Sequence, residues 1–433
     1  MGSGLSLEYC DRSDIGRRRS NNQDSKAVLE PWSREQYRRR GWLFIVADGM
    51  GAHAAGEMAS AIAVEQVALA YEKLAPRSPP LALRRSIEQA NAEIHARGES
   101  AVDLKGMGTT CTALALLPRG ALVGHVGDSR AYRVRDGRIE QLSRDHSLAW
   151  EFEEQRGISG DPDIPAAPRN IITRSMGPHD HVAVDLEGPF PVAERDVFVL
   201  CSDGLSGQVE DAEIGLLAAS LSPRDAAGAL VGLALVRGAP DNVTVIAARA
   251  GQHEATKPDA ATEEWPLSDP SPEAPSRAGP PVRLLITAAA GLLGMLIAAG
   301  LLRPLFGDGR LDPARDAVPL VMLVVGGLLL AGAVGAMLIA GSGRRVDLLA
   351  PGRLLGKGPY RSHACAPTEP LIEGVVASVE AAADGLAPQA RTHALEHVAA
   401  ARRRTAEGDF RGAVAAAAEA IAVYARSIEE ARG

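Results

Sequence analysis

Five aspartates follow a pattern that suits a metal site. Asp48 and Asp203 each stand at the end of a mostly apolar run, 42–47 and 197–202, and directly before a glycine. Such a glycine lets the backbone turn tightly, and at Gly49 it brings a carbonyl oxygen close to whatever the carboxylate holds, as a hard divalent cation requires. A lone Asp-Gly pair is also typical of a simple turn, but its repetition favours the metal site.

Three further aspartates have similar settings. Asp241 precedes the apolar run from Val243, Asp128 follows the run 121–126, and Asp24 lies in an adjoining loop. Carboxylates gathered at one edge of a sandwich would repel one another and raise one another's pKa unless a cation neutralised them. Oxygen ligands point to Mg²⁺ or Mn²⁺ rather than zinc. Two such ions can activate a shared water and clamp a phosphoryl group, and a nearby arginine can hold the phosphate oxygens.

The helices and strands that hydrophobic periodicity predicts must position these residues. Helical spacing predicts a layer of two helices, 54–73 and 81–97. Alternating patterns then predict a meander of antiparallel strands over 109–117, 121–126, 131–134 and 138–142. Further helices are expected over 211–219 and 222–237, before a last core strand from Val243. The looser segment 147–178 reads as a surface insertion that covers the site and shapes substrate access.

Composition argues against several classes of function. The chain has 433 residues and a formal net charge of −8. No basic stripe emerges that could neutralise phosphates, so we expect no nucleic acid partner. The four cysteines are widely separated and lack metal-ligand spacing, which is typical of reduced thiols. The acidic N-terminus has no apolar run, so we expect no cleaved signal peptide and a first domain in the cytoplasm.

Two apolar runs in the last third predict membrane spans. Residues 251–281 have the Pro-, Ser- and acid-rich composition of a disordered linker. The uncharged runs 284–302 and 318–340 are each long enough to cross a bilayer, although one such run alone could be a buried core helix. We therefore expect a transmembrane hairpin over 282–342 in contact with lipid. Flanking arginines favour both ends facing the cytoplasm, as in a multi-pass protein of the inner membrane.

The C-terminal segment 343–433 is alanine-rich and predominantly helical by pattern. Helical spacing over 371–386, 389–407 and 410–432 predicts a small hairpin or bundle that packs on itself or on an unidentified partner. The turn at 408–410 also resembles part of a tetratricopeptide unit, but one unit cannot bury its own face.

The chemical motifs occur in the order and spacing of a known family. They are Arg19-Ser-Asn-Asn-Gln-Asp24, Asp48-Gly-Met-Gly51, Gly108-Thr-Thr110, Gly127-Asp-Ser-Arg130, Ser202-Asp-Gly204 and Asp241-Asn-Val-Thr244. Over about residues 5–250 the chain resembles the metal-dependent serine/threonine protein phosphatases of the 2C class, particularly their bacterial branch. The resemblance implies an α+β phosphatase domain over 1–250, a four-layer α-β-β-α sandwich of two antiparallel sheets flanked by helices.

The resemblance also implies roles around two Mn²⁺ or Mg²⁺ ions. Asp48 would bridge the ions, with Gly49 offering its backbone carbonyl. Asp203 and Asp241 would be the remaining direct ligands, and Asp24 would hold metal-bound water. A hydroxide that bridges the ions would attack phosphorus in line, without a phosphoenzyme.

Further residues are implied beside the ions. Asp128 resembles a ligand of a third, weaker metal site, Arg19 resembles the phosphate clamp, and Asn242 would orient a carboxylate or contact phosphate. Met50 stands where eukaryotic members have a histidine that acts as general acid. The leaving oxygen would therefore take its proton from metal-bound water or from His53.

Three functional hypotheses follow. The leading one is a membrane-anchored phosphatase that acts on phosphoserine and phosphothreonine in a serine/threonine kinase or in kinase substrates. The second is an inactive phosphatase-fold scaffold that docks partners through its helical tail, and the intact set Asp48, Asp203 and Asp241 argues against it. The third keeps the activity and makes the hairpin and tail a sensor that gates it.

Overall fold

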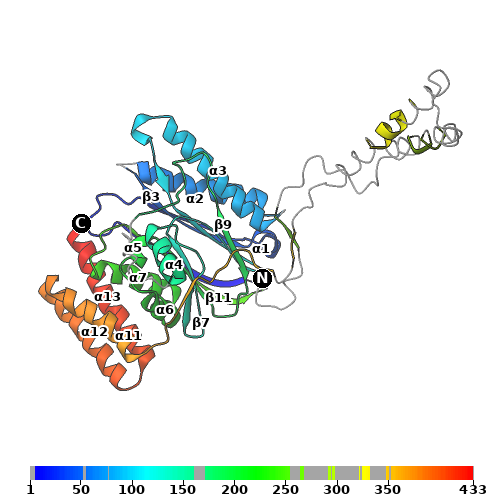
Figure 1. Cartoon of the computed structure of the whole chain (residues 1–433). Coiled ribbons are helices and arrows are strands. Elements are labelled where there is room, and N and C mark those ends of the chain that lie inside the picture. The colour runs from blue at the N-terminus through cyan, green and yellow to red at the C-terminus, as the bar shows by residue number, and fades with distance from the viewer. Residues whose placement is uncertain are drawn as a thin grey trace. The chain divides into compact units, whose positions relative to one another are not determined.

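Two antiparallel β-sheets lie face to face in the computed structural model of the chain (Figure 1). Contacts divide the chain into one compact unit of residues 1–267 and 348–433 and a second of residues 268–347. The structure describes residues 5–51, 55–76, 78–159, 171–253, 264–267, 291–293, 295–297, 321, 324–331, 348–350 and 353–432.

The first sheet has the strand order β2-β3-β5-β6-β9, and its neighbours pair antiparallel. Its strands are β2 (Asp24–Leu29), β3 (Trp42–Met50), β5 (Cys111–Leu117), β6 (Gly120–Val126) and β9 (Asp185–Phe190). The short strand β4 (Gly108–Thr109) pairs with the end of β3, beside Gly49 and Met50. The single meander predicted over 109–142 is wrong, because only its first two strands, β5 and β6, lie in this sheet, whereas its last two pair in the second sheet.

The second sheet has the order β1-β11-β10-β7-β8-β14, with antiparallel neighbours throughout. Its strands are β1 (Leu5–Asp14), β11 (Val243–His253), β10 (Val197–Cys201), β7 (Arg130–Arg135), β8 (Arg138–Gln141) and β14 (Arg361–Ala364). The chain thus returns from its C-terminal part to add an edge strand to the sheet that carries Asp203.

Strand β3 is buried on both faces, which explains the uninterrupted apolar sequence of residues 42–47. In β3, Leu43 and Ile45 face one apolar core, while Phe44 and Val46 face another. Side chains alternate along a strand, so each face takes every second residue. One core fills the space between the sheets, and the two others lie between each sheet and its helices.

Helices cover the outer faces of the sandwich (Figure 1). The helices α2 (Ala55–Leu74) and α3 (Pro79–Glu99) pack on the first sheet, whereas α6 (Asp211–Ser220) and α7 (Pro223–Val236) pack on the second. Shorter helices lie in the connections of the chain, namely α1 (Arg34–Arg40), α4 (Leu148–Ser159), α5 (Asp203–Ser206) and the 3-10 turn Val102–Leu104. The predicted α+β architecture of two antiparallel sheets and flanking helices is confirmed.

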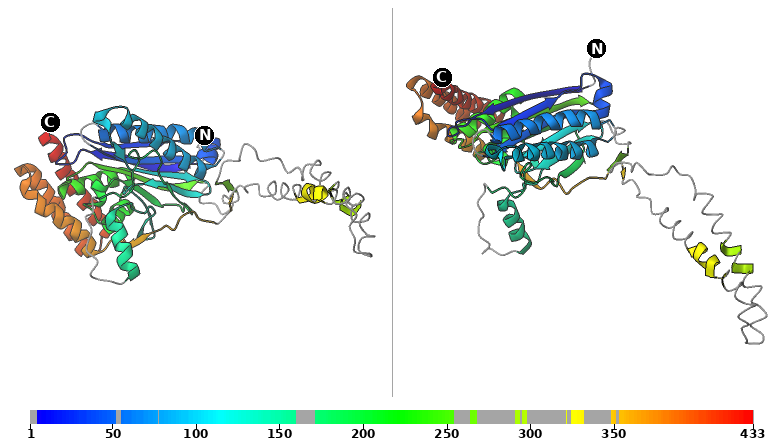
Figure 2. Two further views of the ribbon diagram at one scale, coloured as in Figure 1. Left: turned by 45° about the horizontal axis from the view of Figure 1, so that its top comes forward. Right: turned by 90° about the horizontal axis from the view of Figure 1, so that it is seen from above.

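The C-terminal helices form an additional layer outside α6 and α7, as both views in Figure 2 show. They are α11 (Glu369–Ala382), α12 (Pro388–Ala406) and α13 (Phe410–Arg432), with a 3-10 turn at Ala383–Gly385. Their apolar faces, including Val379 and Ile421, belong to the same core as Leu230 of α7. The tail therefore packs on the phosphatase-like part of its own chain.

A small two-stranded sheet closes the compact unit before and after residues 268–347. It pairs β12 (Trp265–Pro266) with β13 (Leu348–Leu349). The guanidinium of Arg119 lies 4.4 Å from the centre of the Trp265 ring and donates to the carbonyl of Leu349 at 3.1 Å. The domain boundaries at 250, 281 and 342 stay predictions.

The membrane location predicted from the sequence is wrong for the described part of the chain. Among those residues, no helix combines the length and apolar character that a bilayer crossing requires. The described helical residues near the predicted spans are 291–293, 295–297, 321 and 324–331. Most of the predicted spans 284–302 and 318–340 lies outside the described residues, as does most of the linker 251–281.

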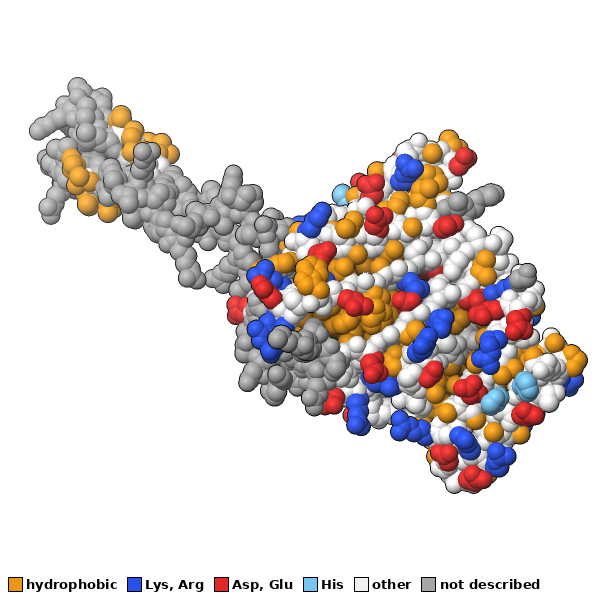
Figure 3. Space-filling model, turned by 180° about the vertical axis from the view of Figure 1, so that it is seen from behind, with side chains coloured by type: hydrophobic (Ala, Val, Ile, Leu, Met, Phe, Trp, Pro, Cys, Tyr) orange, Lys and Arg blue, Asp and Glu red, His pale blue; other side chains and the backbone are white. Residues whose placement is uncertain are grey.

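Acidic and basic side chains are interspersed on the face seen in Figure 3. This face shows no broad area of a single sign among its described residues. A mixed surface produces little long-range attraction for a polyanion.

The contact between α7 and α13 gives a test of how the tail packs. A Cβ atom added at Gly232 would lie 2.5 Å from Cγ2 of Ile421, whereas one added at Gly228 meets nothing within 4 Å. We expect Gly232→Ala to destabilise the full chain by about 1–3 kcal/mol through overpacking. The matched change Gly228→Ala should stabilise it by about 0.5–1 kcal/mol through helix propensity. Thermal unfolding measures both, and equal stabilisation by the two variants would show that α13 does not pack on α7.

Candidate active site

The register of the sheets brings the predicted aspartates to one end of the sandwich. In the β2–β3 pair, Asp24 lies directly opposite Asp48. Asp203 opens α5 just after β10, and Asp241 lies two residues before β11, the antiparallel neighbour of β10. Asp128 lies in the turn between β6 and β7. In an antiparallel pair, one strand ends where the next begins, so these carboxylates converge at the same end of the sandwich.

Tight backbone packing holds the Asp48 turn in place. A Cβ atom at Gly49 would lie 2.1 Å from the carbonyl oxygen of Gly56 and 2.5 Å from that of Gln23, so only glycine fits. The hydroxyl of Thr110 accepts from the Asp48 amide at 2.9 Å, and the Thr110 amide donates to the Asp48 carbonyl at 2.9 Å. These contacts give the Gly108-Thr-Thr motif its role as a brace of β3.

Several carboxylate oxygens at this end are shielded from solvent and have no hydrogen-bond partner among the described residues. They are Oδ1 of Asp24, Asp128 and Asp203. Burial raises the pKa of Asp24 to about 7, even though the Ser202 hydroxyl donates to its other oxygen at 2.8 Å. Burial and the charges of Asp203 and Asp145 raise the pKa of Asp128 to about 8.

Asp48 and Asp203 show the same effect. Burial, followed by the charges of Asp24 and Asp203, raises the pKa of Asp48 well above its ordinary value. Burial also raises the pKa of Asp203. Shielded carboxylates that repel one another are a donor set that a divalent cation would neutralise, so these residues fit Mg²⁺ or Mn²⁺. Within the described residues, no three Asp, Glu, His or Cys side chains are arranged to hold one ion together, so these positions define no coordination geometry.

Arg19 and Asn242 lie beside this cluster. The guanidinium of Arg19 is 47% exposed and donates to Asp241 Oδ2 at 2.7 Å. Asn242 is buried, accepts from the Gln23 amide at 2.8 Å, and donates to two backbone carbonyls of the loop before β2, at 2.9 and 3.0 Å. The Asn242 side chain therefore braces the loop that carries Arg19.

The sequence of this region matches a known family. Residues 16–228 match the family model Protein phosphatase 2C. The chain is 34% identical over 240 residues to Serine/threonine phosphatase stp of Listeria welshimeri, which covers 54% of this chain and 92% of that protein. It is 37% identical over 251 residues to Serine/threonine protein phosphatase PstP of Mycobacterium tuberculosis, which covers 56% of this chain and 45% of that one. The chain belongs to the protein phosphatase 2C family.

Solved structures include similar proteins. The catalytic domain of serine threonine protein phosphatase PstP, in complex with 2 manganese ions, is 33% identical and covers 57% of this chain and 98% of that one, with a TM-score of 0.48. The S. agalactiae serine/threonine phosphatase is 34% identical and covers 56% and 99%, with a TM-score of 0.48.

Family membership confirms several predictions. The predicted family and the enzyme class, a protein serine/threonine phosphatase, are confirmed. The predicted cofactor, Mn²⁺ or Mg²⁺, is confirmed as the one that phosphatases of this family use. Phosphorylated proteins are likewise confirmed as the class of partner. Lipid and a partner of the tail have no such support.

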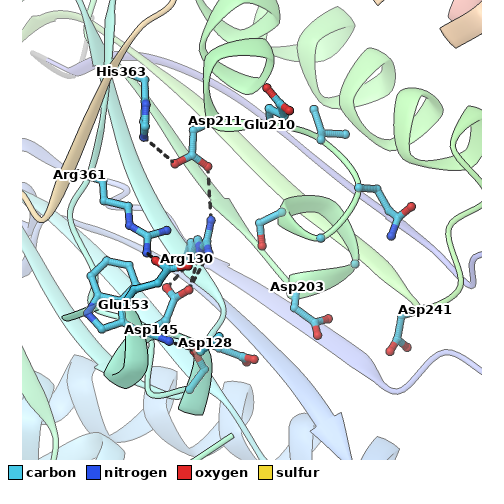
Figure 4. A pocket seen from close by; sticks show the side chains of 18 of the residues that line it. Asp128, Arg130, Asp145, Glu153, Asp203, Glu210, Asp211, Asp241, Arg361 and His363 are labelled. Atoms are coloured by element: carbon cyan, nitrogen blue, oxygen red, sulfur yellow. Dashed lines mark hydrogen bonds and ion pairs between the residues drawn. The ribbon is translucent and has the colours of Figure 1, made fainter. Parts of the chain in front are cut away.

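In this phosphatase 2C chain, a cleft of about 610 Å³ extends from the aspartates toward the C-terminal strand β14 (Figure 4). Asp128, Asp203 and Asp241 line one part of it, and Arg361 and His363 of β14 line another. Strand β14 was not expected here, because no local pattern of the sequence reveals which sheet edge a distant strand will join.

Two arginines in the cleft were not singled out from the sequence. Arg130 is mostly buried, donates to both oxygens of Asp145, and lies 3.3 Å from Asp211. Its motif was recognised, but its role depends on partners far along the chain. The guanidinium of Arg361 lies 4.0 Å from the centre of the Trp150 ring and forms an ion pair with Glu153, so β14 contacts α4 at the cleft wall.

Two further predictions fall at the edge of the described residues. His53 lies outside them, so its role as a proton donor stays a prediction. Met50 ends β3 and lies opposite Gly108. The predicted flap 147–178 begins with α4, and its residues 160–170 lie outside the described part of the chain.

The raised pKa of Asp128 predicts that ionisation of this carboxyl group lowers the free energy of unfolding of the metal-free protein. The folded-state pKa of about 8 exceeds the ordinary value of 3.8, so the folded state loses stability, relative to a neutral side chain, as pH rises from about 4 to about 8. In chelator, Asp128→Asn should therefore gain stability over the native protein by up to about 1.4 kcal/mol per pH unit in this range.

Chemical unfolding at pH 5, 6, 7 and 8 measures this gain. The matched variant Asp103→Asn removes an exposed carboxylate and should show no comparable trend. A gain that does not grow with pH would contradict the assignment.

Proposed function

We propose that this chain hydrolyses the phosphate monoesters of phosphoserine and phosphothreonine in proteins, with two Mn²⁺ or Mg²⁺ ions at the sheet edge. One observation carries the proposal. Shielded, unpartnered carboxylate oxygens of Asp24, Asp128 and Asp203 gather at one end of a 2C-family sandwich, beside Arg19. Without cations, such a cluster of carboxylates costs folding free energy. Membership in the 2C family explains why the chain has it.

Asp48, Asp203 and Asp241 would hold the two ions, together with the carbonyl of Gly49. Asp24 lies opposite Asp48 and would hold coordinated water, and Asp128 would serve a third site. When bound, the ions neutralise the carboxylates, lower the pKa of water and stabilise charge on the phosphoryl group.

The chain's own residues would bind and orient the phosphate. Arg19 is half-exposed and already holds an anionic partner, Asp241, so its guanidinium suits the phosphate oxygens. Asn242 would position Arg19 through the loop backbone rather than touch phosphate. In the reaction, an oxygen of water bonds to phosphorus and the bond from phosphorus to the side-chain oxygen breaks. That oxygen takes up a proton, for which His53 stays a candidate donor.

The substrates would be phosphoproteins produced by serine/threonine kinases, or the kinases themselves. The intact set of predicted ligands, with Asp24 opposite Asp48 and Asp203 at the start of α5, supports the enzyme over the alternative of an inactive scaffold.

Phosphate release from a phosphothreonine peptide tests the proposal. The full chain should turn the peptide over with Mn²⁺ and lose activity in chelator. Asp203→Asn should lower kcat by about 100-fold or more, because a metal ligand and its charge are lost. The same change at exposed Asp103 should leave the rate unchanged.

Turnover that persists in chelator would contradict the metal dependence. A rate in Asp203→Asn equal to that of Asp103→Asn would contradict the assigned site. Retained Mn²⁺ binding without any turnover would instead favour the scaffold.

A further inference from the structure

The C-terminal helix α13 lies against the unit that carries the active site. Along its middle, Ile421 packs over Gly232 of α7, close enough that even a methyl group at Gly232 would collide. This contact lies beyond the residues 16–228 that match the family model, so the family does not describe it. The end of α13 then reaches the loop that follows β1, near the C label in Figure 1.

Two side chains of α13 hold this loop. Arg432 donates to both carboxylate oxygens of Asp14, at 3.0 and 3.1 Å, and to the carbonyl of Gly16 at 2.5 Å. The hydroxyl of Tyr424, which is 3% exposed, accepts from Arg17 at 3.1 Å. One guanidinium nitrogen of Arg432 thus reaches both oxygens of Asp14, while the other donates to the backbone of Gly16. Three contacts from one guanidinium fix its geometry more firmly than a simple surface ion pair does.

The same loop also contacts the segment that carries Asp241, at the active site. Gly16 has a φ of +75°, and a Cβ atom there would lie 2.0 Å from the carbonyl oxygen of Asp241. The amide of Arg17 donates to the carbonyl of Ala239 at 2.8 Å. The loop thus has little freedom between α13 and the segment that carries Asp241. Arg19 follows two residues after Arg17, and its guanidinium bonds to Asp241.

We propose that α13 is a positioning element for the phosphate clamp, with Arg432 and Tyr424 fixing the loop 14–17 and thereby the place of the Arg19 guanidinium. This inference rests on the proposed function, in which Arg19 binds the phosphate. Neither Arg432 nor Tyr424 touches the substrate. The tail therefore serves phosphate binding in its own chain, in addition to any partner that it docks.

Phosphate binding by the full chain tests this role independently of turnover. Titration calorimetry with inorganic phosphate, in saturating Mn²⁺, should give a dissociation constant about three- to tenfold larger for Arg432→Ala than for the native protein. Tyr424→Phe removes a single hydroxyl and should weaken phosphate by a smaller factor. KM for a phosphothreonine peptide should rise in parallel, while Mn²⁺ affinity and the melting temperature stay close to native values.

Arg426→Ala is the matched control, because it removes the same charge from an exposed position on the same helix. It should leave phosphate binding unchanged. Equal phosphate affinities in Arg432→Ala and Arg426→Ala would overturn the proposal.

A double-mutant cycle decides whether Arg432 acts through Arg19. In an Arg19→Ala background, adding Arg432→Ala should cause no further loss of phosphate affinity. Losses that simply add would show that Arg432 acts by another route and would overturn the proposal. Native protein that binds phosphate without hydrolysing the peptide would contradict the proposed function and leave the cycle informative about α13.

Discussion

Electrostatic repulsion among carboxylates is the constraint on which the rest of this structure depends. Asp24, Asp48, Asp128 and Asp203 are brought to one end of the sandwich, and shielding raises the pKa of each. A flexible chain would relieve this repulsion by moving the side chains apart. Three apolar cores, one between the sheets and two beneath the helices, prevent that movement. The carboxylates are thus held ready for cations at the expense of metal-free stability.

Hydrogen bonds from outside the carboxylate set keep the loops at this end in place. Thr110 braces the turn after β3, and Asn242 braces the loop before β2. Arg130 places a buried positive charge beside the cleft and is itself neutralised by Asp145 and Asp211. Such residues bind no substrate in the proposed reaction, but they restrict the positions that the reactive groups can take.

The C-terminal part of the chain adds to the catalytic unit at two separate places. Strand β14 extends the second sheet and brings Arg361 and His363 to the cleft. Helix α13 covers α7 and reaches the loop of Arg19. A tail that looks like an independent helical bundle in sequence is therefore part of the folded phosphatase unit. Its apolar helical spacing showed that it must bury a face, but the spacing could not show against what.

The sequence by itself determined the aspartates at strand ends, because apolar strands followed by Asp-Gly are local patterns that need no partner to be recognised. It also determined the family through motifs in a known order, and the two-sheet architecture followed from that resemblance. Hydropathy alone also led to the wrong membrane location, since no helix of the described residues is long and apolar enough to cross a bilayer. Only the tertiary structure decided that Arg130 is buried between two acids, that β14 joins the second sheet, and that Arg432 reaches Asp14. These contacts join residues far apart in the chain, and long-range pairing depends on how the cores pack rather than on any local pattern.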